Sequence, residues 1–209
     1  QGRGSEARAL ALPSALGISS SPVPMPRRLC RRPRSPHILL KSSNIYLVGP
    51  MGSGKTTIGR RVARVTGKAF QDSDREIEER TGVSIAVIFE VEGEAGFRLR
   101  ERQVIDHLTQ SRNTVVATGG GAVIEPQNRL WLRERGFVVY LRASVDRLYA
   151  HTWRDRGRPL LRTADPKGRL AELLAERDPW YREIADLIVD TDGRTVRQLI
   201  HEITTASRQ

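Results

Sequence analysis

Residues 49–60 read GPMGSGKTTIGR. This stretch matches the pattern G-x-x-x-x-G-K-[ST], in which glycines allow successive backbone N–H groups to curl around phosphate oxygens. An apolar run, NIYLV at 44–48, precedes it, and a segment with helical spacing follows it, so the loop has the strand and the helix that the pattern requires. The sequence therefore predicts a site for a nucleoside triphosphate, and it leaves the phosphate acceptor open.

Two side chains of this loop are suited to bind the phosphates and their metal ion. Lys55 is expected to reach the β- and γ-phosphates of the nucleotide, and Thr56 to offer its hydroxyl to Mg²⁺. The helix that begins here adds partial positive charge at its N-terminus. An ordinary glycine-rich strand–turn–helix is the alternative interpretation, which the Lys-Thr pair in register with both flanks disfavours.

Apolar runs alternate with helical segments from Asn44 onward. We expect strands at 44–48, 68–74, 113–121, 137–143 and 186–191. Helical segments are expected at 56–67, 74–110 (interrupted at Gly82 and at Gly93/Gly96), 126–135, 144–154, 167–183 and 195–206. This alternation predicts an α/β fold with a parallel sheet covered on both faces, and with ligands at the carboxyl ends of its strands.

Composition limits the class of protein. The 209 residues suffice for one substantial α/β domain. The chain has no apolar run of 18 residues, so no membrane span is expected. Its one cysteine, Cys30, lies outside the expected domain, which excludes a disulfide within that domain and fits a reducing compartment.

The net charge of +11 is concentrated near the N-terminus. Residues 1–41 contain seven Arg, one Lys and one Glu, so they carry +7 and leave +4 for residues 42–209. The segment is rich in Pro, Ser and Arg without periodicity, and we expect it to be disordered. An extension without a function of its own is the preferred interpretation; a targeting peptide and an arm for nucleic acid or an anionic surface are the alternatives.

Carboxylates, arginines and glycines suited to a phosphate acceptor follow the loop. Asp72 and Asp74 end the second strand, and we expect them to point to opposite sides, Asp72 toward a metal and Asp74 toward an open pocket. Either is also suited to cap the next helix. Arg98 lies in a glycine-interrupted helix, and Arg177 lies just before a proline where a helix is expected to end. The alternative interpretation for each arginine is an ordinary solvent-exposed side chain, since single arginines are usually solvated. The alternative for TGGG at 118–121 is a simple turn. Together these groups suit a small polyhydroxylated carboxylate.

A basic loop, RDRGRPLL at 154–161, is suited to close over the nucleotide and bring a cation to the transferring phosphoryl group. Pro159 restricts Arg158 to extended conformations, which favours a defined position for that arginine. A solvated basic loop is the alternative interpretation.

The order of these motifs resembles that of shikimate kinases. The P-loop is followed by D-S-D, R-T-G, E-G-E-x-x-F-R, T-G-G-G, R-P-L-L and R-x-P-x-Y, within about residues 44–203. The resemblance implies a three-layer α/β/α P-loop kinase fold at 42–209, with a five-stranded parallel sheet, a helical substrate-binding insert and a mobile lid at about 151–166. It also implies transfer of the γ-phosphoryl group of ATP to the 3-hydroxyl of shikimate, on the route to chorismate and the aromatic amino acids.

The matching motif positions imply a role for each site residue. Lys55, Asp74 and Arg158 are implied to be catalytic, and Thr56 is implied to bind Mg²⁺ with Asp72 assisting through water. ATP is implied to be held by Gly52, Ser53, Gly54, Lys55, Thr56, Thr57, Arg158 and Arg194. Shikimate is implied to be held by Asp74, Arg98, Gly119, Gly120, Gly121 and Arg177.

The chain departs from the family pattern at one position. His151 stands seven residues before Arg158, where many relatives have an arginine near the adenine. A non-catalytic ATP-binding homologue, or a kinase of another small metabolite such as gluconate, is the alternative function. Nucleic acid is not expected as a partner. The resemblance implies a monomeric, cytoplasmic enzyme, with plastid import by the N-terminal extension as the alternative location.

Overall fold

The computed structural model describes residues 44–153 and 163–208. The N-terminal extension and Arg158, with most of the expected lid, lie outside these residues, so the expectations for them stay predictions. Within the described ranges, no helix combines the length and the apolar character needed to cross a lipid bilayer.

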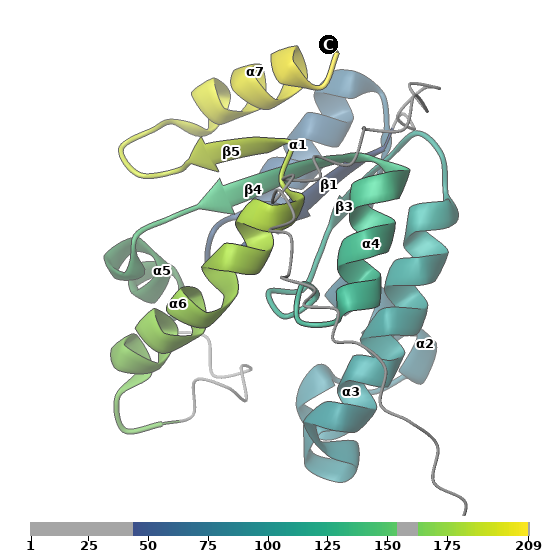
Figure 1. Cartoon of the computed structure of the whole chain (residues 1–209), viewed down its shortest axis with the longest axis vertical. Helices are drawn as coiled ribbons and strands as arrows, with labels where there is room; N and C mark the ends of the chain where they lie inside the picture. Colours follow the sequence, from purple (N-terminus) through teal and green to yellow (C-terminus); the bar gives the residue numbers. More distant parts are fainter. Residues whose placement is uncertain (1–43, 154–162, 209) are drawn as a thin grey trace, which may run out of the picture. The chain divides into compact units, whose positions relative to one another are not determined.

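Five parallel strands form the centre of the molecule in the order β2-β3-β1-β4-β5 (Figure 1). Their bounds are β1 Ile45–Val48, β2 Ala69–Asp72, β3 Thr114–Ala117, β4 Phe137–Arg142 and β5 Leu187–Asp190. The expected five-stranded parallel sheet is therefore confirmed. Ile45 of β1 pairs with Val115 on one side and Phe137 on the other, so the chain diverges to both sides of β1. The carboxyl edge at such a divergence is where ligands of open α/β sheets bind.

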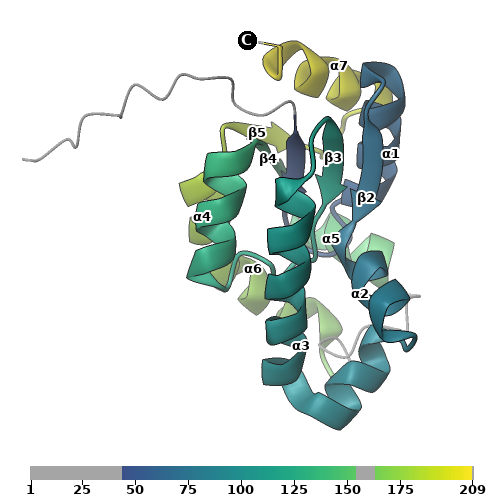
Figure 2. The same ribbon diagram turned by 90° about the vertical axis from the view of Figure 1, so that its right-hand side faces the viewer.

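Helices cover both faces of this sheet (Figure 2). Alternate strand residues face opposite layers: Ile45 and Leu47 pack with α1 and α7, whereas Tyr46 and Val48 pack with α3, α4 and α6. Burial on both faces explains why the three central strands, β1, β3 and β4, read as apolar runs. The helices are α1 Lys55–Thr66, α2 Ser73–Thr81, α3 Ile85–Gln110, α4 Pro126–Arg135, α5 Val145–Thr152, α6 Pro166–Ile184 and α7 Val196–Ala206.

The helical insert between β2 and β3 is interrupted where two glycines take left-handed backbone angles. Gly82 ends α2 with φ of 71°, and Gly93 divides α3 with φ of 69°. Residues other than glycine rarely adopt these angles, so both predicted interruptions are confirmed. Gly96, in contrast, stays within the second half of α3.

Helix α6 confirms the helix predicted at 167–183, and it runs through Pro179. It extends from Pro166 to Ile184, so the expectation that the chain leaves a helix at Arg177, just before Pro179, was wrong. Pro179 has no N–H to donate to the carbonyl of Ala175. The next turn nevertheless buries Tyr181 and Ile184 against the sheet, and this packing stabilises the continued helix.

Candidate active site

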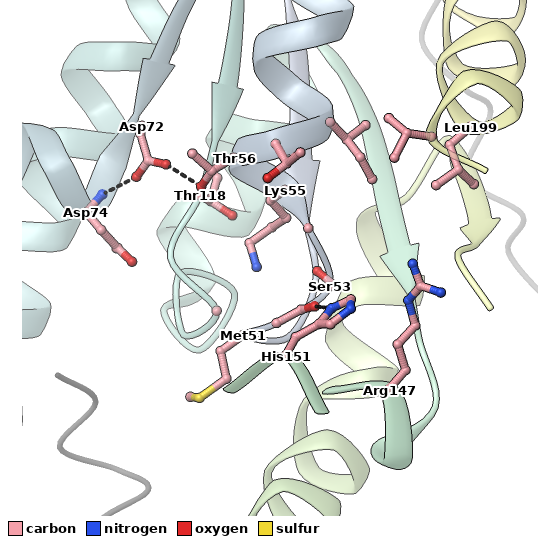
Figure 3. Close-up of a pocket in the computed structure, with 16 residues that line it drawn as sticks. Met51, Ser53, Lys55, Thr56, Asp72, Asp74, Thr118, Arg147, His151 and Leu199 are labelled. Carbon is pink, nitrogen blue, oxygen red and sulfur yellow. Dashed lines mark hydrogen bonds between the residues drawn. The ribbon is translucent and has the colours of Figure 1, made fainter. Parts of the chain in front are cut away.

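A cleft of about 480 Å³ opens at the carboxyl edge of the sheet, beside the phosphate loop (Figure 3). The ends of β2 and β3 bound it on one side, and α5 and α7 on the other. Its lining residues are Met51, Gly52, Ser53, Gly54, Lys55, Thr56, Thr57, Ile58, Asp72, Asp74, Thr118, Gly120, Arg147, His151, Val196 and Leu199. The structure therefore brings the whole predicted phosphate loop together with both aspartates and the central glycine of the triplet.

The N-terminus of α1 faces this cleft without a side-chain cap. Its N-cap residue is Gly54, with φ of 90°, and no side chain caps it in the described residues. Each of the other six helices of the described chain has a side-chain cap, from Asp72, Ser84, Glu125, Ser144, Asp165 and Thr195. First-turn N–H groups that lack a side-chain cap, together with the helix dipole, suit an anion such as a phosphate.

The ammonium group of Lys55 lies inside the curl of the loop. Its Nζ donates to the carbonyl oxygens of Gly49 and Pro50, each over 2.8 Å, and the residue is only 8% exposed. These two carbonyls hold the cation within the loop. The structure therefore places a positive charge where the loop is shaped for phosphates.

Thr56 and Asp72 form the oxygen-rich part of the cleft. The Thr56 hydroxyl donates to Oδ2 of Asp72 over 2.7 Å (Figure 3). Hydroxyl and carboxylate oxygens are ligands that Mg²⁺ prefers, and Mg²⁺ commonly keeps several waters beside one or two protein groups. No cluster of three or more His, Cys, Asp or Glu suited to a metal occurs in the described ranges. The pair thus fits a magnesium ion that is shared with nucleotide phosphates.

Asp72, and not Asp74, caps α2. Oδ1 of Asp72 accepts from the backbone N–H groups of Asp74 and Arg75, while its Oδ2 faces Thr56. The expectation that the two aspartates point to opposite sides was wrong, because residues two apart on a strand share a face and because the strand already ends at Asp72, with the helix beginning at Ser73. Both carboxylates consequently line the same cleft.

The glycine triplet after β3 allows the acceptor-side groups to approach its backbone. A Cβ atom at Gly119 would lie 2.5 Å from Oδ1 of Asp74 and 2.8 Å from Oε1 of Glu101. A Cβ atom at Gly121 would lie within 2.6 Å of the guanidinium of Arg98. The triplet is therefore more than a turn, since any larger residue at either position would displace these side chains.

Arg98 is held by two carboxylates on its own helix. Its Nη1 donates to Glu101 over 2.6 Å and its Nη2 to Glu94 over 2.8 Å. Burial raises the pKa of Glu101 to about 7, although Arg98 acts to lower it; Asp74 raises it and Arg177 lowers it by smaller amounts. These interactions show that Asp74, Arg98, Glu101 and Arg177 form one electrostatic cluster. The sequence reasoning missed Glu101, whose only signal was its position one turn after Arg98.

Arg177 reaches this cluster from α6. It is 5% exposed, and its Nε has no hydrogen-bond partner among the described residues. Its guanidinium lies beside the hydroxyl of Tyr181 and acts to lower the pKa of that group; the same hydroxyl donates to the carbonyl of Gly120. A buried guanidinium with an unused N–H is suited to bind an anionic group of a ligand.

The end of the cleft opposite Asp74 is formed by α5 and α7. His151 Nδ1 lies 2.8 Å from the carbonyl oxygen of Gly52, and Arg147 and Leu199 line the cleft beside it (Figure 3). The sequence reasoning missed Arg147. Arg194 is not brought into this cleft: it forms an ion pair of 2.5 Å with Glu202 beside a separate hollow on α7. The role implied for Arg194 at the adenine thus stays a prediction that this cleft does not support.

The cleft combines the uncapped N-terminus of α1 and the ammonium of Lys55 with the oxygen atoms of Thr56 and Asp72. The buried cluster of carboxylates and arginines lies next to these groups. This arrangement on a parallel five-stranded sheet defines a P-loop kinase of small molecules. The chain belongs to the shikimate kinase family, whose family model matches residues 51–208.

Known proteins similar to this chain carry the same description. A shikimate kinase of Nitrosococcus oceani is 60% identical over 166 residues, which cover 79% of this chain and 87% of that protein. The solved structure of a shikimate kinase from Acinetobacter baumannii in complex with shikimate is 49% identical, with a TM-score of 0.76, and the match covers 78% of this chain and 90% of that one. A shikimate kinase from Aquifex aeolicus is 33% identical, with a TM-score of 0.68, and the match covers 78% of this chain and 95% of that one.

Proposed function

We propose that this chain transfers the γ-phosphoryl group of ATP to the 3-hydroxyl of shikimate and releases 3-phosphoshikimate and ADP. The observation that carries the proposal is the position of Asp74, which contacts the glycine triplet. Asp74 lines the same cleft as the phosphate loop, and it also interacts with the buried cluster of Arg98, Glu101 and Arg177. The Acinetobacter baumannii relative supports the choice of acceptor, because its structure contains shikimate.

Phosphoryl transfer depends on positioning and on neutralising charge more than on covalent chemistry. Lys55 and the N-terminus of α1 stabilise the phosphate oxygens, and Arg158 is proposed to contribute from the lid. Thr56 would hold Mg²⁺ directly and Asp72 through water, and the ion would supply positive charge that neutralises the phosphates. Asp74 orients the attacking hydroxyl and accepts its hydrogen bond.

The acceptor-side arginines recognise the carboxylate of shikimate. Arg98 and Arg177 supply guanidinium groups in a largely buried setting, where a charge-assisted hydrogen bond is stronger than in water. Backbone atoms of the triplet at 119–121 lie beside them for the hydroxyl groups. We further propose that the enzyme acts as a monomer in the cytoplasm. The bacterial relatives support this location and give no support to plastid import.

The test is ADP release with Mg·ATP and the full chain, with shikimate, gluconate, AMP or no acceptor. Turnover with shikimate alone is the expected result. Turnover with gluconate or AMP would assign a different kinase activity. ATP binding without turnover on any acceptor would indicate a non-catalytic homologue.

A further inference from the structure

Two buried tyrosines stack beneath the acceptor side of the cleft. The rings of Tyr140 on β4 and Tyr181 on α6 lie 4.9 Å apart at 27°, and both residues are 0% exposed. Burial raises the pKa of both hydroxyls above the ordinary value, so both remain protonated donors. The two hydroxyls nevertheless donate in different directions, and this difference separates their roles.

The Tyr140 hydroxyl donates away from the cluster. It reaches Oδ1 of Asp178 over 2.8 Å, and the other oxygen of Asp178 accepts from Arg182. Asp178 and Arg182 line a separate hollow between α6 and the ends of β4 and β5, and they are absent from the lining of the nucleotide cleft. The hydrogen bond of Tyr140 thus ties β4 to α6 without touching a group that we assign to the acceptor.

The Tyr181 hydroxyl joins two acceptor-side groups. It donates to the carbonyl oxygen of Gly120, 61 residues earlier in the chain, and it lies beside the guanidinium of Arg177, which acts to lower the pKa of this hydroxyl. Because a peptide group is planar and trans, fixing the Gly120 carbonyl also fixes the direction of the Gly121 N–H. One hydroxyl therefore fixes the triplet and lies next to a buried guanidinium.

This anchor acts on a weakened turn of α6. Pro179 lies between Arg177 and Tyr181, and it cannot donate the helical hydrogen bond to Ala175. The turn that carries Arg177 has consequently lost one of its backbone restraints. The hydrogen bond from the Tyr181 hydroxyl to Gly120, in the loop after β3, replaces part of that restraint close to Arg177.

We propose that Tyr181 is a positioning residue for the phosphate acceptor, which holds Arg177 and the glycine triplet in the arrangement that binds the acceptor carboxylate and hydroxyls. The inference rests on the proposed function. It predicts a larger effect on shikimate binding than on nucleotide binding, because Tyr181 does not itself line the cleft beside the phosphate loop and acts on it only through Gly120.

The test compares Tyr181→Phe with Tyr140→Phe in the full chain. Each change removes one buried hydroxyl from the same ring pair and retains the ring, so the two variants are matched in packing. We expect Tyr181→Phe to raise the KM for shikimate by about tenfold, with the KM for ATP changed less than about twofold. Tyr140→Phe should leave both KM values near those of the wild type. Circular dichroism and thermal unfolding of both variants check the fold.

The outcomes separate the inference from the proposed function. A wild-type chain with no turnover of shikimate would overturn both. An active wild type in which the two variants show the same KM for shikimate, or in which Tyr181→Phe raises both KM values equally, would overturn the positioning role alone.

A double-mutant cycle tests the part of the inference that runs through Arg177. If Tyr181 acts partly by holding Arg177, the rise in KM for the variant with both Tyr181→Phe and Arg177→Ala should be smaller than the product of the two separate rises. A rise equal to that product would overturn the link to Arg177.

Discussion

Glu101 and Arg98 form a buried ion pair one helical turn apart, in which Nη1 of Arg98 donates to Oε2 of Glu101 over 2.6 Å. The other carboxyl oxygen, Oε1, has no hydrogen-bond partner in the described part of the chain. Burial raises the pKa of Glu101 to about 7 despite the opposing attraction of Arg98. The net charge beside Asp74 therefore changes close to neutral pH.

This titration should appear in the stability of the protein. Between pH 4.5 and about 7 the folded chain binds more protons at Glu101 than the unfolded chain does, so the free energy of unfolding falls as the pH rises. At about 1.4 kcal/mol per pH unit, the contribution lost across this window is about 3 kcal/mol. Glu101→Gln removes the titration, so urea unfolding from pH 4 to 8 should show the variant gaining stability relative to the wild type as the pH rises. A difference that stays constant with pH would contradict this assignment.

Asp74→Asn should lower kcat by about 10²–10⁴-fold, because the amide keeps the size of the side chain but loses the charge that accepts from the attacking hydroxyl. The KM for ATP should change little. Steady-state kinetics with shikimate measure both values. Glu79→Gln is the matched control, since Glu79 lies on the same helix in an exposed ion pair with Arg75. Near-normal turnover in Asp74→Asn would remove Asp74 from the catalytic groups.

Asp72→Asn should raise the Mg²⁺ concentration that gives half-maximal rate by about tenfold. Asparagine caps a helix as well as aspartate does, so α2 should keep its N-terminal cap while the negative charge beside Thr56 is lost. ADP release is followed over a range of Mg²⁺ at constant ATP, and circular dichroism confirms that the helices persist. An unchanged dependence on Mg²⁺ would show that Asp72 acts only as a cap.

Arg177→Ala and Arg98→Ala should each raise the KM for shikimate by about 10²-fold, because the acceptor carboxylate loses a charge-assisted hydrogen bond in a buried setting. The KM for ATP should remain within about twofold. Arg133→Ala, on an exposed position of α4, is the control. Equal rises in the KM values for both substrates would point to a general loss of structure.

Arg147→Ala should raise the KM for ATP by about twofold to fivefold and leave the KM for shikimate unchanged, since a cation over an aromatic base contributes about 0.5–1 kcal/mol at an exposed site. Arg147 lines the nucleotide end of the cleft, and its Nε lies 3.9 Å from Oδ1 of Asp192. Arg194→Ala in the same assay compares the two arginines. A larger effect at Arg194 would restore the role that the family pattern implies for it.

Local sequence signals predicted most of the fold. Each strand and helix has its own apolar period, and the loop at 49–56 needs glycine, lysine and threonine at fixed spacings because backbone N–H groups themselves bind phosphate. The effect of a proline inside a helix was less certain. The helix at 167–183 was predicted to within one residue at each end, but the expectation that the chain leaves a helix at Arg177 was wrong. The packing of Tyr181 and Ile184 outweighs the effect of Pro179, and such packing involves residues distant in the chain.

The sequence by itself determined the family and the phosphate loop, since their motifs depend on residues close together in the chain. It also indicated the parallel sheet, through the alternation of strand and helix signals. Only the tertiary structure decided that Asp72 caps α2 and faces Thr56, that Glu101 is buried beside Arg98, and that Arg194 pairs outside the cleft. It also decided that Tyr181 reaches Gly120 across 61 residues. The burial of a side chain and the groups that it contacts decide whether it is charged and where it points. Both arise only when separate elements pack together.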